Sequence, residues 1–177
     1  VNNESSEIIR IFNYSFNDLT HNHDDYYPEK YRDSIDEINH FIYHYINNGV
    51  YKVGFSKTQS AYDKAVKNLF ESLDTIEKRL ENKKYLVSDS LTEADIRFIP
   101  TLIRFDTVYY IHFKCSNKRI IDYKNISRYL KDIYSIESVK NTTNQDHIKR
   151  HYYYSHRMIN PYGIIPNTEN ALCLPES

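Results

Sequence analysis

The chain has 177 residues, of which 40% are hydrophobic and 27% charged, so it can bury one sizeable core and is not generally disordered. Three Gly and five Pro are too few for a β-sandwich or barrel with many tight turns, and they favour long helices. A formal charge of −1 gives no bulk electrostatic reason for nucleic-acid binding, and no apolar run approaches the roughly 18 residues of a membrane span.

The first predicted element is a short helix over residues 5–16, which follows polar residues that can cap it. Its apolar residues recur at helical spacing: Ile8, Ile9, Phe12 and Phe16. Residues 17–28 are polar and end in Pro28, so we expect a linker in that stretch. A second helix is predicted from Pro28, because proline fits a first helical turn, until Asn48-Gly49 ends it.

The middle of the chain continues this helical pattern. Residues 50–56 are expected to be a short connection. The third helix, over residues 58–82, has the most regular apolar face of the chain. That face consists of Tyr62, Ala65, Val66, Leu69, Phe70, Leu73, Ile76 and Leu80. Three further helices are predicted over residues 92–113, 125–135 and 144–154.

The fourth helix has the strongest start signal, because Thr92 is followed three residues later by Asp95, an acidic variant of the capping box. The stretch that follows is apolar on most sides, which is typical of a helix buried among others. Pro100 in its interior should kink it, and Arg104 with Asp106 is interpreted as a buried structural pair. These elements together predict an all-α bundle of five or six helices.

The start of the first helix permits a ligand-binding interpretation. Free backbone N–H groups at a helix start bind carboxylates, and a Ser hydroxyl with a Glu carboxylate can hold a ligand that carries both a carboxylate and an ammonium group. The stretch Asn3-Glu4-Ser5-Ser6-Glu7 offers these groups. Ordinary helix capping is the alternative, and from the residues alone it is the favoured interpretation.

Histidines and cysteines give weaker signals. Two pairs of histidines are spaced by four residues: His40 with His44, and His147 with His151. Such pairs can share a metal ion, but no carboxylate or thiol completes either of them, so solvated or packed histidines are favoured and no metal site is predicted. Cys115 and Cys173 show no metal or disulfide spacing. A packed thiol is expected at Cys115, and a reducing, cytoplasmic location is the default.

Longer stretches, taken in chain order, carry a more specific signal. They are Val1-Asn2-Asn3-Glu4-Ser5-Ser6-Glu7-Ile8-Ile9-Arg10, Asn47-Asn48-Gly49-Val50-Tyr51-Lys52, Thr92-Glu93-Ala94-Asp95, Leu102-Ile103-Arg104-Phe105-Asp106 with Val108-Tyr109, His112-Phe113-Lys114-Cys115, and Asp146-His147-Ile148 leading through His151-Tyr152 and Ser155-His156 to Ile159-Asn160-Pro161. Together they resemble the glutathionyl-hydroquinone reductases, the Xi class of glutathione transferases, over nearly the whole chain.

The resemblance implies a domain organisation. Residues 1–18 would be the last helix of a thioredoxin-like, glutathione-binding domain, and residues 19–28 a linker. Residues 29–158 would form the helical bundle of a glutathione transferase C-terminal domain, and residues 159–177 a C-terminal tail. The resemblance also implies a homodimer formed through the helical domains, and an exposed helical face once covered by the thioredoxin-like domain would favour such association.

The resemblance implies a mechanism as well. In that family a Cys thiolate of the thioredoxin-like domain attacks the sulfur of a glutathionyl-hydroquinone, which frees the hydroquinone and leaves a mixed disulfide that a second glutathione resolves. The catalytic Cys precedes the Asn-Glu-Ser segment with which this chain opens, and neither Cys115 nor Cys173 stands in its place. We therefore expect an enzyme at full length, with glutathione as co-substrate, but no catalytic residue and no activity in this chain alone.

Five residues of the chain match positions with a role in the family. Glu4 and Ser5 resemble the pair that holds the γ-glutamyl amino and carboxylate groups of glutathione. Tyr51 and Tyr152 resemble the phenols that line the aromatic substrate pocket and hydrogen-bond the quinol oxygens, and Tyr109 is a further candidate.

Two other functions stay open at this point. The first is a non-catalytic, glutathione-transferase-like module that binds hydrophobic ligands or partner proteins. The second, which fits the residues less well, is a free-standing helical metal or scaffold protein. Neither a nucleic acid nor a membrane is expected as a partner.

Overall fold

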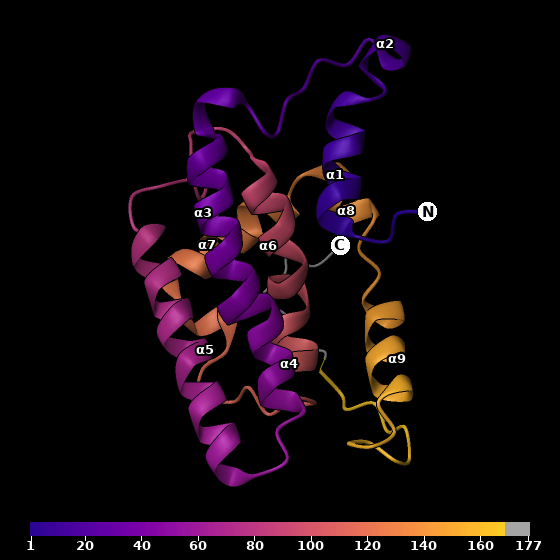
Figure 1. Ribbon diagram of the computed structural model, residues 1–177. Coiled ribbons are helices and arrows are strands. Elements are labelled where there is room, and N and C mark those ends of the chain that lie inside the picture. Colours follow the sequence, from indigo (N-terminus) through magenta and orange to yellow (C-terminus); the bar gives the residue numbers. More distant parts are fainter. Residues whose placement is uncertain (169–177) are drawn as a thin grey trace.

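The computed structural model describes residues 1–168, and every regular element in that part of the chain is helical (Figure 1). The α-helices are α1 (Ser5–Tyr14), α2 (Asn17–Thr20), α3 (Arg32–Ile42), α4 (Asn48–Gly54), α5 (Gln59–Arg79), α6 (Glu93–Arg104), α7 (Lys124–Tyr134), α8 (Glu137–Asn141) and α9 (Gln145–Ser155). The remaining elements are the 3₁₀ turns η1 (Glu29–Tyr31) and η4 (Ile120–Asp122) and the π-helical turns η2 (Tyr43–Asn47) and η3 (Phe105–Tyr109). The all-α prediction is confirmed, and the helices that the periodicity missed, α2 and α8, are short.

The second predicted helix is longer than expected, because α3, η2 and α4 follow one another without a break. The helix passes through Gly49 and takes in most of the connection expected at 50–56. A Cβ on Gly49 would lie 3.3 Å from Cδ1 of Leu69 on α5, and one on Gly54 would collide with the ring of Phe113. Both glycines let a neighbouring side chain approach the helix closely, and this packing outweighs their tendency to end helices.

Helix α6 lies in the middle of the bundle (Figure 1), and its start is fixed by the predicted capping box of Thr92 and Asp95. Asp95 is fully buried. Its carboxylate accepts hydrogen bonds from the Leu86 N–H at 3.0 Å, from the N–H and the hydroxyl of Thr92 at 2.9 Å each, and from the Tyr129 hydroxyl at 2.9 Å. Burial raises the pKa of Asp95, and these donors oppose the rise. One carboxylate thus joins the preceding loop, α6 and α7.

The expected pairing of Arg104 with Asp106 is wrong. Asp106 is buried and accepts hydrogen bonds from the backbone N–H groups of Ile120 at 2.6 Å and Ile121 at 3.2 Å, so it fixes the start of η4. Burial raises the pKa of Asp106 to about 6. Arg104 donates instead from Nη1 to the carbonyl oxygen of Pro100 at 2.7 Å. Side chains two positions apart on a helix do not face each other, which explains the failed pairing.

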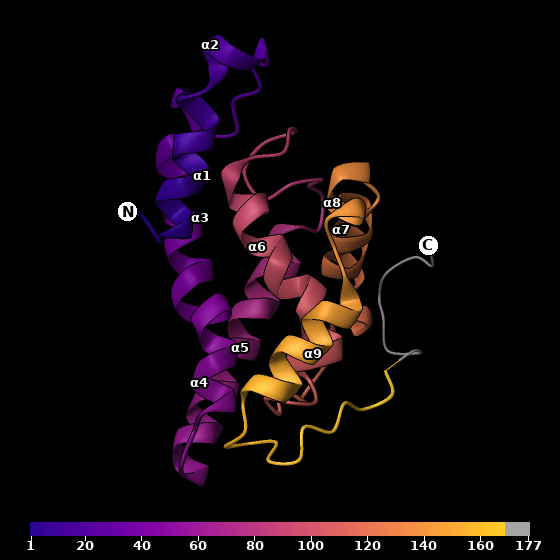
Figure 2. The same cartoon turned by 90° about the vertical axis from the view of Figure 1, so that its right-hand side faces the viewer.

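Helix α1 is attached to α3 and to the first turn of α6 by ion pairs of Arg10 (Figure 2). Arg10 Nε donates to the buried carboxylate of Glu93 at 3.0 Å, and its guanidinium lies 4.0 Å from the centre of the Tyr27 ring. The outer side of α1 and α2 is apolar and open to solvent, since Phe12 is 68% exposed and Leu19 77%. The expected linker therefore holds a short helix, and its neighbour α1 presents an uncovered apolar surface.

The chain returns through α7 and α8 to α9, which packs against η3. After α9 the backbone is irregular up to residue 168, and Ile159 and Ile165 lie against the core. The rest of the expected tail, residues 169–177 with Cys173, lies outside the described residues. None of the helices in residues 1–168 combines the length and the apolar character that crossing a bilayer requires.

Candidate functional site

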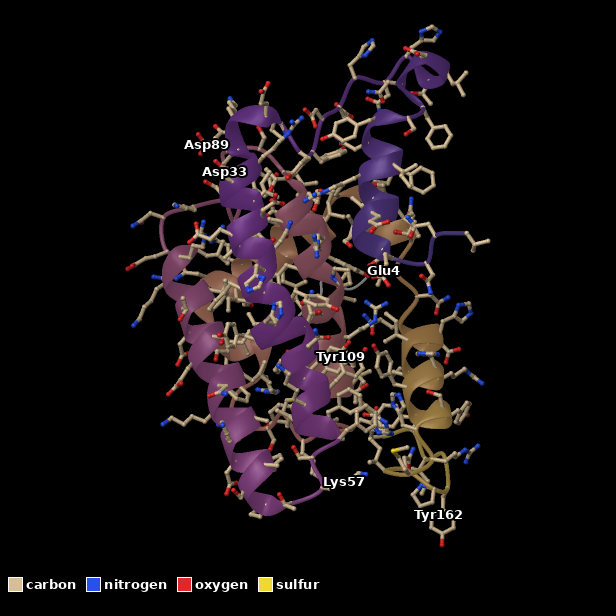
Figure 3. All side chains as sticks on the ribbon, viewed as in Figure 1. Glu4, Asp33, Lys57, Asp89, Tyr109 and Tyr162 are labelled. Carbon is tan, nitrogen blue, oxygen red and sulfur yellow. The ribbon has the colours of Figure 1, made fainter. Side chains whose placement is uncertain are left out.

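A cavity of about 660 Å³ opens between the start of α1, the continuous α3–α4 helix, α6 and α9. The five residues that the sequence singled out all line it: Glu4, Ser5, Tyr51, Tyr109 and Tyr152. Figure 3 shows Glu4 at the end of α1 that faces toward Tyr109. Side chains 148 positions apart in the sequence, from Glu4 to Tyr152, therefore meet around one space.

Three tyrosine hydroxyls form a hydrogen-bonded chain in the wall of this cavity. The Tyr152 oxygen lies 2.8 Å from that of Tyr51 and 2.8 Å from that of Tyr109. Tyr51 comes from α4 and is 36% exposed, whereas Tyr109 on η3 is 2% exposed. Burial raises the pKa of Tyr152 to about 12 and also raises that of Tyr109. Both hydroxyls therefore keep their protons at neutral pH and can donate.

The three hydroxyls lie close enough to exchange hydrogen bonds among themselves. Either oxygen of the Tyr51–Tyr152 pair and of the Tyr109–Tyr152 pair can be the donor, and Tyr51 is also a hydrogen-bonding neighbour of the Tyr109 hydroxyl. Tyr109 and Tyr152 are buried, whereas Tyr51 is the partly exposed member. When Tyr109 donates to Tyr152 and Tyr152 donates to Tyr51, the hydrogen of Tyr51 is free to be donated into the cavity.

Both π-helical turns border the cavity, η2 through Tyr43 and Asn47 and η3 through Tyr109. Asn47 connects the two helices that carry them, because its Nδ2 donates to the Arg97 carbonyl at 3.3 Å and its Oδ1 accepts from the Thr101 hydroxyl at 2.9 Å. π-Helical turns occur frequently at functional sites, where they re-aim side chains. Apolar periodicity does not reveal such turns, so the sequence analysis missed them.

The start of α1 has unoccupied donors. The backbone N–H groups of Ser5 and Ser6 find no acceptor among the described residues, and no side chain caps the helix. Glu4 uses its carbonyl oxygen for the first backbone bonds of the helix and leaves its carboxylate exposed. The side chains of Glu4 and Ser5 therefore do not act as ordinary helix caps, which was the alternative interpretation of this stretch. The free N–H groups are available to an anionic group of a ligand.

Two arginines in the cavity wall were missed as site residues. Arg97 donates to Glu93 at 3.2 Å, and this buried carboxylate also accepts from Arg10 and from Asn39. Arg104 has only its bond to the Pro100 carbonyl among the described residues. The sequence analysis did not consider Arg104 as a site residue because it assigned Arg104 to a buried ion pair with Asp106.

The weaker candidates do not form a second site. Cys115 is fully buried, and burial raises the pKa of its thiol, so it is the packed thiol that was expected. No three metal-ligating side chains converge anywhere in residues 1–168. An unexpected pair is formed by His112 and His156, whose Nε2 and Nδ1 atoms lie 3.2 Å apart. Burial lowers the pKa of His112 to about 4.

Comparison with known proteins adds the following. The family profile described as "Glutathione S-transferase, C-terminal domain" matches residues 59–132. The glutathionyl-hydroquinone reductase PcpF of Sphingobium chlorophenolicum is 52% identical over 166 residues, which are 94% of this chain and 53% of that protein. The chain thus spans about half the length of the curated relatives it matches.

Solved structures agree with the sequence matches. The glutathione-bound structure of YqjG from Escherichia coli K-12 is 52% identical and superposes with a TM-score of 0.91, covering 94% of this chain and 54% of that one. The glutathione transferase Xi of Phanerochaete chrysosporium is 50% identical with a TM-score of 0.94, covering 99% and 61%.

Proposed function

Because the chain belongs to the glutathione transferase family and has the fold of its C-terminal helical domain, we propose that it is the substrate-binding part of an enzyme that reduces glutathionyl-hydroquinones. The observation that carries this proposal is the joint lining of one cavity by the start of α1 and by the tyrosine chain. One end can hold a peptide-like anion and the other a flat phenol, and these are the two parts of a glutathionyl-hydroquinone.

The glutathione part of the substrate is assigned to the start of α1. The free N–H groups of Ser5 and Ser6 suit the γ-glutamyl carboxylate, and the exposed carboxylate of Glu4 suits the amino group. Glutathione would act here as a co-substrate. The relative YqjG has been solved with glutathione bound, which supports the assignment of this ligand.

The hydroquinone part is assigned to the tyrosine chain. Tyr51 is the partly exposed member of the tyrosine chain, so its hydroxyl would donate to a ring oxygen of the substrate. Tyr152 lies behind it, also lines the cavity and supports its hydroxyl. Tyr109 is too deeply buried for direct contact with a large ligand, and its role is to position Tyr152.

The proposed reaction of the whole protein is thiol transfer. A cysteine thiolate outside this chain attacks the sulfur of the conjugate in its keto tautomer, in which the carbon that bears the sulfur is tetrahedral, and a mixed disulfide forms. The sulfur–carbon bond breaks, its electron pair moves into the ring to give the phenolate of the hydroquinone, and this phenolate takes up a proton. A second glutathione thiolate then releases the cysteine and leaves as glutathione disulfide. Negative charge reaches the ring oxygens during the first step, and a hydroxyl donor such as Tyr51 stabilises it. Cys115 has no part in this scheme, since its thiol is buried.

Assembly follows from the same family assignment. The exposed apolar side of α1 and α2 would pack against the part of the protein that the relatives have and this chain does not span. Two such proteins would associate through their helical domains, in the cytoplasm.

Binding experiments test the proposal on the chain itself. S-(2,5-dihydroxyphenyl)glutathione is titrated against the chain and its Tyr51→Phe variant, and we expect affinity to fall several-fold when the hydroxyl donor is removed. Tyr154→Phe is the matched control, because Tyr154 is exposed on α9 and does not line the cavity. Equal affinity of all three proteins, or no binding to any, would contradict the proposed function.

A further inference from the structure

Arg104 is a cation in the cavity without a carboxylate partner. It is the last residue of α6, directly before η3, and it lines the same space as the three tyrosines. In the part of the chain that the structure describes, no acidic group lies within ion-pair distance of its guanidinium. One nitrogen, Nη1, donates to the Pro100 carbonyl at 2.7 Å, and the other donors remain available.

The other charges around the cavity are accounted for. Arg97 pairs with Glu93, and Arg10 pairs with both Glu93 and Asp36. The two positive charges of this cluster are therefore neutralised by its two carboxylates. Glu4 lies at the α1 end, where the proposed function assigns it to the ammonium group of glutathione. Among residues 1–168, Arg104 is therefore the positive charge in the cavity wall that lacks a counter-charge.

Arg104 lines the same cavity as the three tyrosines of the phenol end. Burial is the main cause that raises the pKa of Tyr152, and the positive charge of Arg104 opposes this rise. A ligand ring that reaches the tyrosine chain would therefore share the cavity with the Arg104 guanidinium.

We propose that Arg104 binds a carboxylate carried by the aromatic ring of the substrate, so that the site prefers acidic hydroquinone conjugates over neutral ones. This inference rests on the proposed function and names the substrate class of the same cavity. The planar guanidinium matches a carboxylate with two parallel N–H···O bonds, which an ammonium group does not. The bond to Pro100 holds the guanidinium in place before the ligand arrives, and this preorganisation reduces the entropy lost on binding.

The test compares two small rings that differ in charge. Gentisate (2,5-dihydroxybenzoate) and the neutral 2,5-dihydroxybenzamide are titrated against the chain by NMR, which measures weak affinities and does not depend on the glutathione end of the cavity. We expect gentisate to bind roughly tenfold more tightly, the range of a hydrogen-bonded charge pair. Arg104→Gln should bring the ratio of the two dissociation constants close to one. Arg104→Lys should retain only part of the preference, and added salt should reduce it.

Arg150→Gln is the matched control for net charge, since Arg150 lies on α9 outside the cavity and pairs with Asp146. This variant should keep the wild-type ratio. Equal affinities for gentisate and the amide in the wild-type chain, or a preference that survives Arg104→Gln, would overturn the inference and leave the proposed function standing. If neither ring binds, both the proposed function and this inference fail.

Discussion

Removal of the Asp95 side chain tests the buried junction at the start of α6. Asp95→Ala takes away the common acceptor of four hydrogen bonds, and it leaves buried donors on Leu86, Thr92 and Tyr129 without that acceptor. A buried donor without a partner costs about 1–3 kcal/mol. Part of the loss is offset, because the variant no longer buries a carboxylate whose pKa is raised by burial. We expect a net destabilisation of about 3 kcal/mol.

Thermal unfolding followed by circular dichroism at neutral pH measures this effect. For a chain of this length 1 kcal/mol corresponds to about 2–4 °C, so the Tm of Asp95→Ala should fall by about 6–12 °C. Tyr129→Phe removes one donor and not the acceptor, so it should cost only about 1 kcal/mol. Asp89→Ala, an exposed site in the preceding loop, is the control for lost charge. The reasoning is refuted if Asp95→Ala costs no more than Asp89→Ala.

Four other predictions concern the core, the pH dependence, the thiol and the assembly. Gly54→Ala should cost about 1–3 kcal/mol in thermal unfolding, because its Cβ would collide with Phe113. Between pH 4 and 6 the folded chain retains a proton on Asp106 and lacks one on His112, so Asp106→Asn should make Tm rise more steeply with pH and His112→Gln less steeply. Iodoacetamide should alkylate native Cys115 far more slowly than unfolded Cys115. Light scattering at micromolar concentration should give the mass of a dimer.

Each of these has a control or a contradicting outcome. Gly49→Ala should be tolerated better than the change at Gly54, since its Cβ would lie 3.3 Å from Leu69. Parallel curves of Tm against pH for the wild type and both titration variants would show that neither buried group is linked to folding. Alkylation of Cys115 at its unfolded rate would mean that the thiol is accessible, and a monomer mass at all concentrations would contradict the dimer.

The fold was predictable where one local rule decides the structure. Apolar periodicity located α5 and α7 to within a few residues, and the spacing of Thr92 and Asp95 predicted the start of α6. The prediction failed at Gly49, where the helix was expected to end. Gly49 stays inside the helix because the absence of a Cβ lets Leu69 of α5 pack closely against it, and no sequence spacing indicates that contact. Contacts between distant elements of this kind outweigh the low helix propensity of glycine.

The two ends of the candidate site were predictable in different ways. Glu4 with Ser5 was indicated by the chemistry of a helix start as well as by resemblance, whereas Tyr51 and Tyr152 were singled out by resemblance alone. No local pattern indicates that Tyr51 and Tyr152 share a hydrogen bond across 101 positions. Arg104 was assigned to an ion pair because charges in a buried helix need partners, but that rule does not say whether the partner is a side chain or a ligand. Within residues 1–168 the structure leaves the guanidinium in the cavity wall without a carboxylate partner.

The hydroxyl of Tyr109 contributes little to stability, and its effect is on the neighbouring hydroxyls. A phenylalanine would fill the same buried space, and the hydrogen bond to Tyr152 contributes only about 1 kcal/mol, which the cost of burying a hydroxyl largely cancels. The oxygen of Tyr109 lies 2.8 Å from that of Tyr152, which in turn lies 2.8 Å from that of Tyr51. When Tyr109 donates to Tyr152, Tyr152 can donate to Tyr51, and the hydrogen of Tyr51 is then available to a ligand in the cavity. A buried hydroxyl that no ligand contacts can thereby determine how the partly exposed Tyr51 meets the ligand.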